Sequence, residues 1–69
     1  MGHYVITRAG WYLAARPGWG PTVTQDLNEA RRFNSVSEAY EYRRNHDFFE
    51  NYNIGKISMP LYGVVNLIA

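Results

Sequence analysis

The 69-residue sequence predicts an α+β domain, in which a small antiparallel sheet packs against one main helix, with a short extra helix beside it. Three observations lead to this fold class. Residues 4–15 alternate like a β-hairpin, two helix-capping motifs begin at residues 26 and 35, and the C-terminal run is apolar and rich in β-branched residues. We expect a single domain over residues 1–69, with the hairpin and one or two C-terminal strands in the same sheet.

The hairpin is predicted from alternating residues on either side of a glycine. Successive residues of Tyr4–Ala9 point to opposite faces, Gly10 offers the turn, and Trp11–Ala15 continues the alternation. The turn is not an Asn-Gly sequence, so its type stays open. The segment Arg16–Pro21 then contains two prolines and two glycines, which exclude a continuing strand or helix.

Two copies of one capping motif predict two helices in quick succession. Asp26-Leu27-Asn28-Glu29-Ala30 is followed by Ser35-Val36-Ser37-Glu38-Ala39. A side-chain oxygen three residues ahead of a glutamate forms a capping box at a helix N-terminus. We expect a short helix over Leu27–Arg31 and the main helix over about Val36–His46.

The main helix is expected to bury one stripe of residues at three- and four-residue spacing. The members of this stripe are Val36, Ala39, Tyr40 and Arg43. Phe33, in the link between the two helices, is also expected to be buried.

The C-terminal residues predict strands. Ile54–Ser58 has the composition of a strand interrupted by Gly55, and Leu61–Ala69 is almost wholly apolar. Because an exposed apolar edge strand invites aggregation, this last strand must be central, covered by the helix, or paired with another copy of the chain. We predict a homodimer, formed through Leu61, Tyr62, Val64, Val65 and Ile68.

Composition excludes several classes of protein. Seven Lys and Arg against six Asp and Glu give a net charge of +1, which is too balanced for a dedicated DNA-binding protein. The chain contains no cysteine, so a disulfide or a thiolate metal site is excluded. No run approaches the ~20 apolar residues of a membrane span, and Met1–Gly10 does not resemble a signal peptide. A cytoplasmic protein with no membrane partner is expected.

Tyr4-Val5-Ile6, Tyr12-Leu13, the segment from Asp26 to Phe33, and Ser35 with Glu38-Ala39 together resemble a group of short uncharacterised proteins of bacteriophages and prophages. The resemblance spans roughly residues 4–42. It implies the cytoplasm of an infected or lysogenic bacterium, where small phage proteins bind a host protein and inhibit or redirect it, as anti-CRISPR proteins do. The group has no agreed activity, so no residue role is carried over.

Residues with catalytic chemistry are few. His3 and His46 are far apart and in no metal-ligand spacing, and we expect His46 to serve as a polar helix C-terminus. Ser35 and Ser37 are explained as residues of a helix start, and no glycine-rich phosphate loop precedes a helix. We predict a non-enzymatic protein without a cofactor or a metal.

Aromatic residues in loops favour a protein-binding function. A 69-residue core is too small to bury them all, and large aromatic residues and arginine dominate interface hot spots. The predicted protein-binding residues are Arg16, Trp19, Phe48, Phe49 and Tyr52. A lid over the core remains the other interpretation of the Trp19 ring.

Two further functions stay open. Arg31, Arg32, Arg43 and Arg44, interleaved with aromatic residues, would suit a small nucleic-acid-binding accessory protein. Against this, adjacent arginines on a helix diverge by about 100° and glutamates balance them. In the other alternative the chain is a minor structural or assembly protein, and the apolar C-terminal run is its assembly strand.

Overall fold

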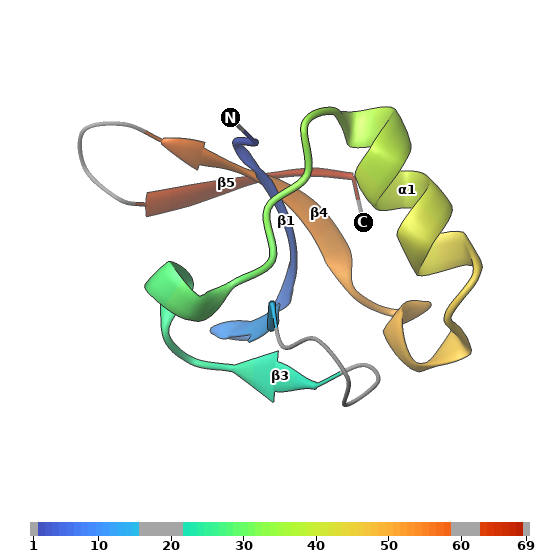
Figure 1. Cartoon of the computed structure of the whole chain (residues 1–69), viewed down its shortest axis with the longest axis horizontal. Helices are drawn as coiled ribbons and strands as arrows, with labels where there is room; N and C mark the ends of the chain where they lie inside the picture. The colour runs from blue at the N-terminus through green and yellow to red at the C-terminus, as the bar shows by residue number, and fades with distance from the viewer. Residues whose placement is uncertain (1, 16–21, 59–62, 69) are drawn as a thin grey trace.

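The computed structural model describes residues 2–15, 22–58 and 63–68 (Figure 1). Its elements in chain order are β1 (Tyr4–Arg8), β2 (Trp11–Leu13), β3 (Val23–Thr24), the 3-10 turn η1 (Leu27–Glu29), α1 (Val36–Arg44), the 3-10 turn η2 (Asp47–Phe49), β4 (Asn53–Ser58) and β5 (Gly63–Ile68). The strands form one antiparallel five-stranded sheet in the order β3-β2-β1-β4-β5. The predicted α+β fold, with an N-terminal hairpin and C-terminal strands in one sheet, is confirmed.

The hairpin has a two-residue turn. Arg8 pairs with Trp11, and the residues between them, Ala9 and Gly10, have φ angles of 50° and 83°. Positive φ at both central residues is the mark of a type I′ turn, whose twist matches that of the flanking strands. Gly10 adopts this conformation freely, whereas Ala9 carries the cost of a left-handed backbone.

Both predicted helix starts are present. The Asp26 side chain accepts a hydrogen bond from the Asn28 N–H at 2.9 Å, and the Ser35 hydroxyl accepts one from the Glu38 N–H at 3.1 Å. The first segment forms only one 3-10 turn, and α1 ends at Arg44, two residues earlier than predicted. These caps satisfy N–H groups that no helical carbonyl reaches.

One face of the sheet packs against α1. Its buried cluster consists of Ile6, Leu13, Phe33, Ala39, Phe49 and Ile54. Neighbouring strand residues point to opposite faces, so Val5 beside Ile6 belongs to a second cluster with Ala30 and Ile57, next to η1. The predicted burial of Phe33, which is 1% exposed, is confirmed.

The predicted inner stripe of the helix was wrong at Tyr40. Its side chain is 45% exposed, whereas Tyr42 is half-buried and packs against the core, 5.6 Å from the Phe33 ring centroid. At about 100° per residue, Tyr40 lies about 100° from the buried Ala39, whereas Tyr42 lies only about 60° away on the other side. The helix therefore faces the sheet through Val36, Ala39 and Tyr42.

Two strands differ from the prediction. The two-residue strand β3, which pairs with β2, was not predicted. The C-terminal strand β5 lies at the edge of the sheet, and Val65 in it is 56% exposed. It is therefore not a central strand, and Val65 is not covered by the helix.

Candidate functional site

The aromatic residues that follow α1 separate into an exposed ring and a buried one. Phe48 in η2 is 65% exposed, whereas Phe49 is fully buried, so the prediction of Phe49 as a contact residue was wrong. The 3-10 turn places these adjacent side chains about 120° apart, so one points into the core and the other outward. Arg16 and Trp19 lie outside the described residues.

The exposed Phe48 ring rests on neighbouring rings. Its centroid is 4.8 Å from that of Phe49, in an edge-to-face arrangement, and 6.0 Å from that of the half-buried Tyr52. Such pairs hold a ring in place through packing and quadrupole attraction.

Hydrogen bonds also fix the backbone of this turn. The Phe49 N–H donates to the His46 carbonyl at 2.9 Å, and the Tyr52 N–H donates to the Phe49 carbonyl at 2.9 Å. From α1, the Arg43 guanidinium donates to the Tyr52 carbonyl at 2.8 Å. We call Phe48 and Tyr52 the aromatic platform.

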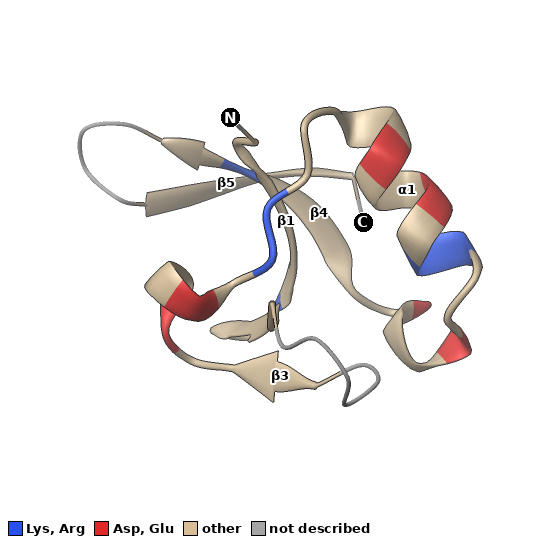
Figure 2. Ribbon diagram, in the orientation of Figure 1, with Lys and Arg blue, Asp and Glu red and all other residues tan. Residues whose placement is uncertain are grey.

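The two predicted arginine pairs lie on different segments of the chain, and one guanidinium group of each pair lies over a different ring of α1. Figure 2 shows blue at the link before α1 and at the end of α1, where the two arginine pairs lie, as well as on β1 and β4. Arg31 lies over the Tyr42 ring at 5.0 Å, and Arg43 lies over the Tyr40 ring at 5.2 Å. Arg32 and Arg44 are exposed.

Acidic residues accompany the second arginine pair. A shallow hollow of about 220 Å³ is lined by Tyr40, Arg43, Arg44, Asp47 and Glu50. A phosphate entering it would meet two carboxylates as well as two guanidinium groups, so its electrostatic attraction is reduced.

The His46 side chain packs against Tyr42 at the end of α1. Its Nδ1 lies 2.9 Å from the Tyr42 carbonyl oxygen, and its ring stacks on the Tyr42 ring at 4.0 Å. Among the described residues no group of three or more His, Asp or Glu side chains lies close enough to hold a metal ion.

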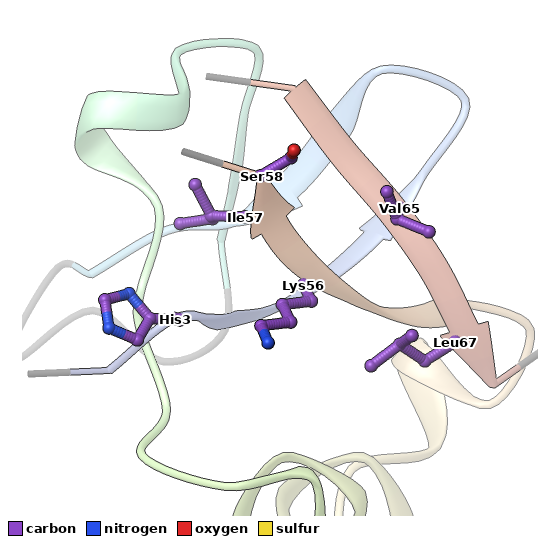
Figure 3. A pocket seen from close by; sticks show the side chains of 6 residues that line it. All are labelled: His3, Lys56, Ile57, Ser58, Val65 and Leu67. Atoms are coloured by element: carbon purple, nitrogen blue, oxygen red, sulfur yellow. The ribbon is translucent and has the colours of Figure 1, made fainter. Parts of the chain in front are cut away.

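An open groove of about 620 Å³ follows the C-terminal edge of the sheet. It is lined by His3, Lys56, Ile57, Ser58, Val65 and Leu67, from the segment before β1, from β4 and from β5 (Figure 3). Val65 and Leu67 are 56% and 47% exposed. Leu67 was not among the predicted dimer residues.

The predicted dimer residues are only partly available to a second chain. Val65 is exposed, whereas Val64 and Ile68 are half-buried and pack against their own core clusters. Leu61 and Tyr62 lie outside the described residues. Leu67 lies two residues after Val65 on the same strand and lines the same groove, and the register shift between Ile54 and Gly55 brings Ile68, not Leu67, opposite Ile54.

Comparisons of the chain with protein-family models, with curated proteins and with solved structures give no match. Within the ranges that the structure describes, no helix combines the length and the apolar content needed to cross a membrane. A proposal of function therefore rests on the aromatic platform, the arginines and the β5 edge.

Proposed function

We propose that the chain is a small, non-catalytic interaction protein that binds a host protein and inhibits or redirects it by occupying one of its surfaces. The observation that carries the proposal is the exposure of the Phe48 ring, which is 65%, on a rigid support. A large apolar ring held outward is costly to hydrate and gains free energy when a partner covers it.

Preorganisation supports a binding function for this ring. Packing on Phe49 and Tyr52, together with the hydrogen bond from Arg43 to the Tyr52 carbonyl, restricts the turn before any partner arrives. Binding then loses less conformational entropy than it would with a mobile loop. The buried Phe49 contributes by holding Phe48, and does not itself contact the partner.

The resemblance of the hairpin and of the segment from Asp26 to Phe33 to short phage and prophage proteins supports the biological setting. The host protein is then bacterial, and the site of action is the cytoplasm of an infected or lysogenic cell. An anti-CRISPR protein or another inhibitor of host defence is the class of activity that we propose.

The test is capture of a partner from bacterial lysate by the tagged chain, read by mass spectrometry, with Phe48→Ala compared against Tyr40→Ala. Tyr40 is a matched control because it is exposed, aromatic and on a different element. We expect Phe48→Ala to lose a stoichiometric protein that Tyr40→Ala retains, with both variants folded by circular dichroism. Equal recovery of the partner by both variants would contradict the proposal.

The nucleic-acid alternative is tested in the same experiment by a nuclease-treated arm. The arginines lie beside aromatic rings, which supports this alternative, but Asp47 and Glu50 oppose phosphate near the second pair. Recovery that vanishes with nuclease, and affinity that falls steeply with salt, would replace the host-protein proposal with this alternative.

The uncovered edge of β5 favours self-association, either as a homodimer or, if the order exceeds a dimer, as an assembly protein. Val65 and Leu67 expose apolar surface on a strand beyond which no described strand pairs. We propose that the chain forms a homodimer through β5. Sedimentation as a monomer at high micromolar concentration would contradict it.

A further inference from the structure

We infer that two copies pair antiparallel through β5 about a two-fold axis, in the register that sets Val65 opposite the partner's Val65. This inference rests on the homodimer proposed above and gives it a defined interface. It does not depend on the host-protein proposal, because the aromatic platform lies on η2 and the segment that follows it.

The hydrogen bonds of β4 determine which residues of β5 point their backbone N–H and C=O groups away from the sheet. The Ile57 N–H donates to the His3 carbonyl at 2.7 Å, so the backbone groups of Ile57 point toward the β1 side. The backbone N–H and C=O groups of successive residues point to opposite sides of a strand, so those of Lys56 point toward β5. Val65 pairs with Lys56, and its backbone groups therefore point toward β4. The next residues on either side, Val64 and Asn66, therefore direct their N–H and C=O groups away from the sheet.

This alternation limits the registers available to a symmetric pair. An outward-facing residue must meet another outward-facing residue to form backbone hydrogen bonds. With Val65 on the axis, Val64 meets the partner's Asn66 and Asn66 meets the partner's Val64. Each of these pairs exchanges both of its hydrogen bonds.

Neighbouring registers use fewer of these groups. Centring on Asn66 sets Val64 against the partner's Ile68, which pairs with Ile54 in its own sheet and so faces inward after the register shift. If Val64 lies on the two-fold axis, Asn66 falls opposite a position of the partner that precedes Gly63, the first residue of β5, and so has no described strand residue to pair with. The Val65 register therefore makes the fullest use of the described strand.

Side chains fit the same register. Val65 and Leu67 line one groove, and Val64 and Asn66 line a hollow on the other face, so the two pairs point to opposite sides. Leu67 lies opposite the partner's Gly63, where an added Cβ would meet nothing within 4 Å and there is room for a larger neighbour.

We infer that the strand pairing with this edge is β5 of a second copy, because nothing in the sequence of β5 opposes pairing with itself. β5, with the sequence Gly-Val-Val-Asn-Leu-Ile, contains no charged residue and no proline, so two copies meet without repulsion or a lost donor. Because β5 is only six residues long, we expect weak association, which sedimentation at high micromolar concentration detects.

Disulfide trapping tests the register. The chain contains no native cysteine, so Val65→Cys introduces a single thiol. Directly opposed residues of a pair without mutual hydrogen bonds have Cα atoms about 4.5 Å apart, within the range that a disulfide spans. Leu67→Cys is the control, because it is similarly exposed but lies about 13 Å from its own copy in this register. In a glutathione buffer we expect Val65→Cys to form a covalent dimer and Leu67→Cys to remain a monomer.

Removing one outward donor provides a second test without a thiol. Asn66→Pro deletes an N–H that faces away from the sheet, so the fold keeps its own hydrogen bonds, whereas Asn66→Ala retains this N–H. By sedimentation equilibrium we expect Asn66→Pro to raise the dimer dissociation constant at least about tenfold, and Asn66→Ala to change it less than about threefold. Circular dichroism at low concentration verifies that both variants fold.

The outcomes separate the interface from the homodimer. A wild-type chain that sediments as a monomer at high micromolar concentration would overturn both. A wild-type dimer in which Leu67→Cys cross-links as readily as Val65→Cys, or in which Asn66→Pro dimerises normally, would keep the homodimer and overturn this interface. Neither result bears on capture of a host protein through Phe48.

Discussion

Gly55 is the position where β4 and β5 approach each other too closely for a side chain. A Cβ built there would overlap Val64 Cγ1, and would lie 3.4 Å from Thr7 Cγ2 and from the Val65 carbonyl oxygen. Val64 is β-branched and cannot turn freely, and the other two atoms prevent a shift away from it. We expect Gly55→Ala to lower the free energy of unfolding by about 2 kcal/mol, as overpacking of a core does.

A double-mutant cycle isolates the cause of this loss. Val64→Ala removes the overlapping methyl, and because Val64 is half-buried it should cost about 1 kcal/mol alone. If the overlap is the cause, the double variant should be destabilised by about 1.5 kcal/mol, well below the roughly 3 kcal/mol obtained by adding the single changes. The coupling of about 1.5 kcal/mol is the part of the loss that belongs to the Gly55–Val64 contact.

Urea unfolding followed by far-ultraviolet circular dichroism measures all four proteins. Gly63→Ala is the matched control on the neighbouring strand, because a Cβ there meets nothing within 4 Å and its φ is not positive, so stability should change by less than about 0.5 kcal/mol. Additive losses in the cycle, or a Gly55→Ala variant as stable as the wild type, would refute the steric argument.

Three further predictions concern the turn, the helix cap and the aromatic platform. Ala9→Asn should raise the melting temperature by a few degrees, because asparagine tolerates the φ of 50° better than alanine does, and Gly10→Ala at φ 83° should lower it; differential scanning calorimetry measures both. Ser35→Ala removes the acceptor of the Glu38 N–H and should cost about 1 kcal/mol in urea unfolding, with Ser37→Ala as the control; equal losses would show that the cap contributes nothing. Phe49→Ala should cost about 3–5 kcal/mol because its ring is fully buried, whereas Phe48→Ala should cost less than about 1 kcal/mol; the reverse order would contradict the assignment of core and surface rings.

Local patterns predicted the parts of this fold that local physics determines. The alternation of Tyr4–Ala9 predicted the hairpin, and the position of Ser35 predicted the first turn of α1. Both depend on residues within a few positions of each other. The burial of Phe33 was also predicted, because it is an apolar residue in a short link between two capped segments.

Features decided by distant contacts were predicted less well. The two residues of β3 carry too little pattern to be recognised, and β2 supplies their pairing. Phe48 and Phe49 are chemically alike, and only the direction of the 3-10 turn separates the exposed ring from the buried one. The apolar run was correctly predicted to be a strand, but its place at the edge depends on β1 occupying the other side of β4.

Because β1 is the central strand, it gains its two neighbouring strands at different times during synthesis. β2 follows β1 after a two-residue turn, whereas the other neighbour, β4, pairs Gly55 with Val5 from far along the chain. Until the ribosome has made β4, one edge of β1 has no partner, and Ile6 lacks Phe49 and Ile54, with which it forms the core. Closing so long a loop is slow compared with forming the hairpin. One edge of β1 therefore stays unpaired until β4 has left the ribosome, and a chaperone can bind it during that interval.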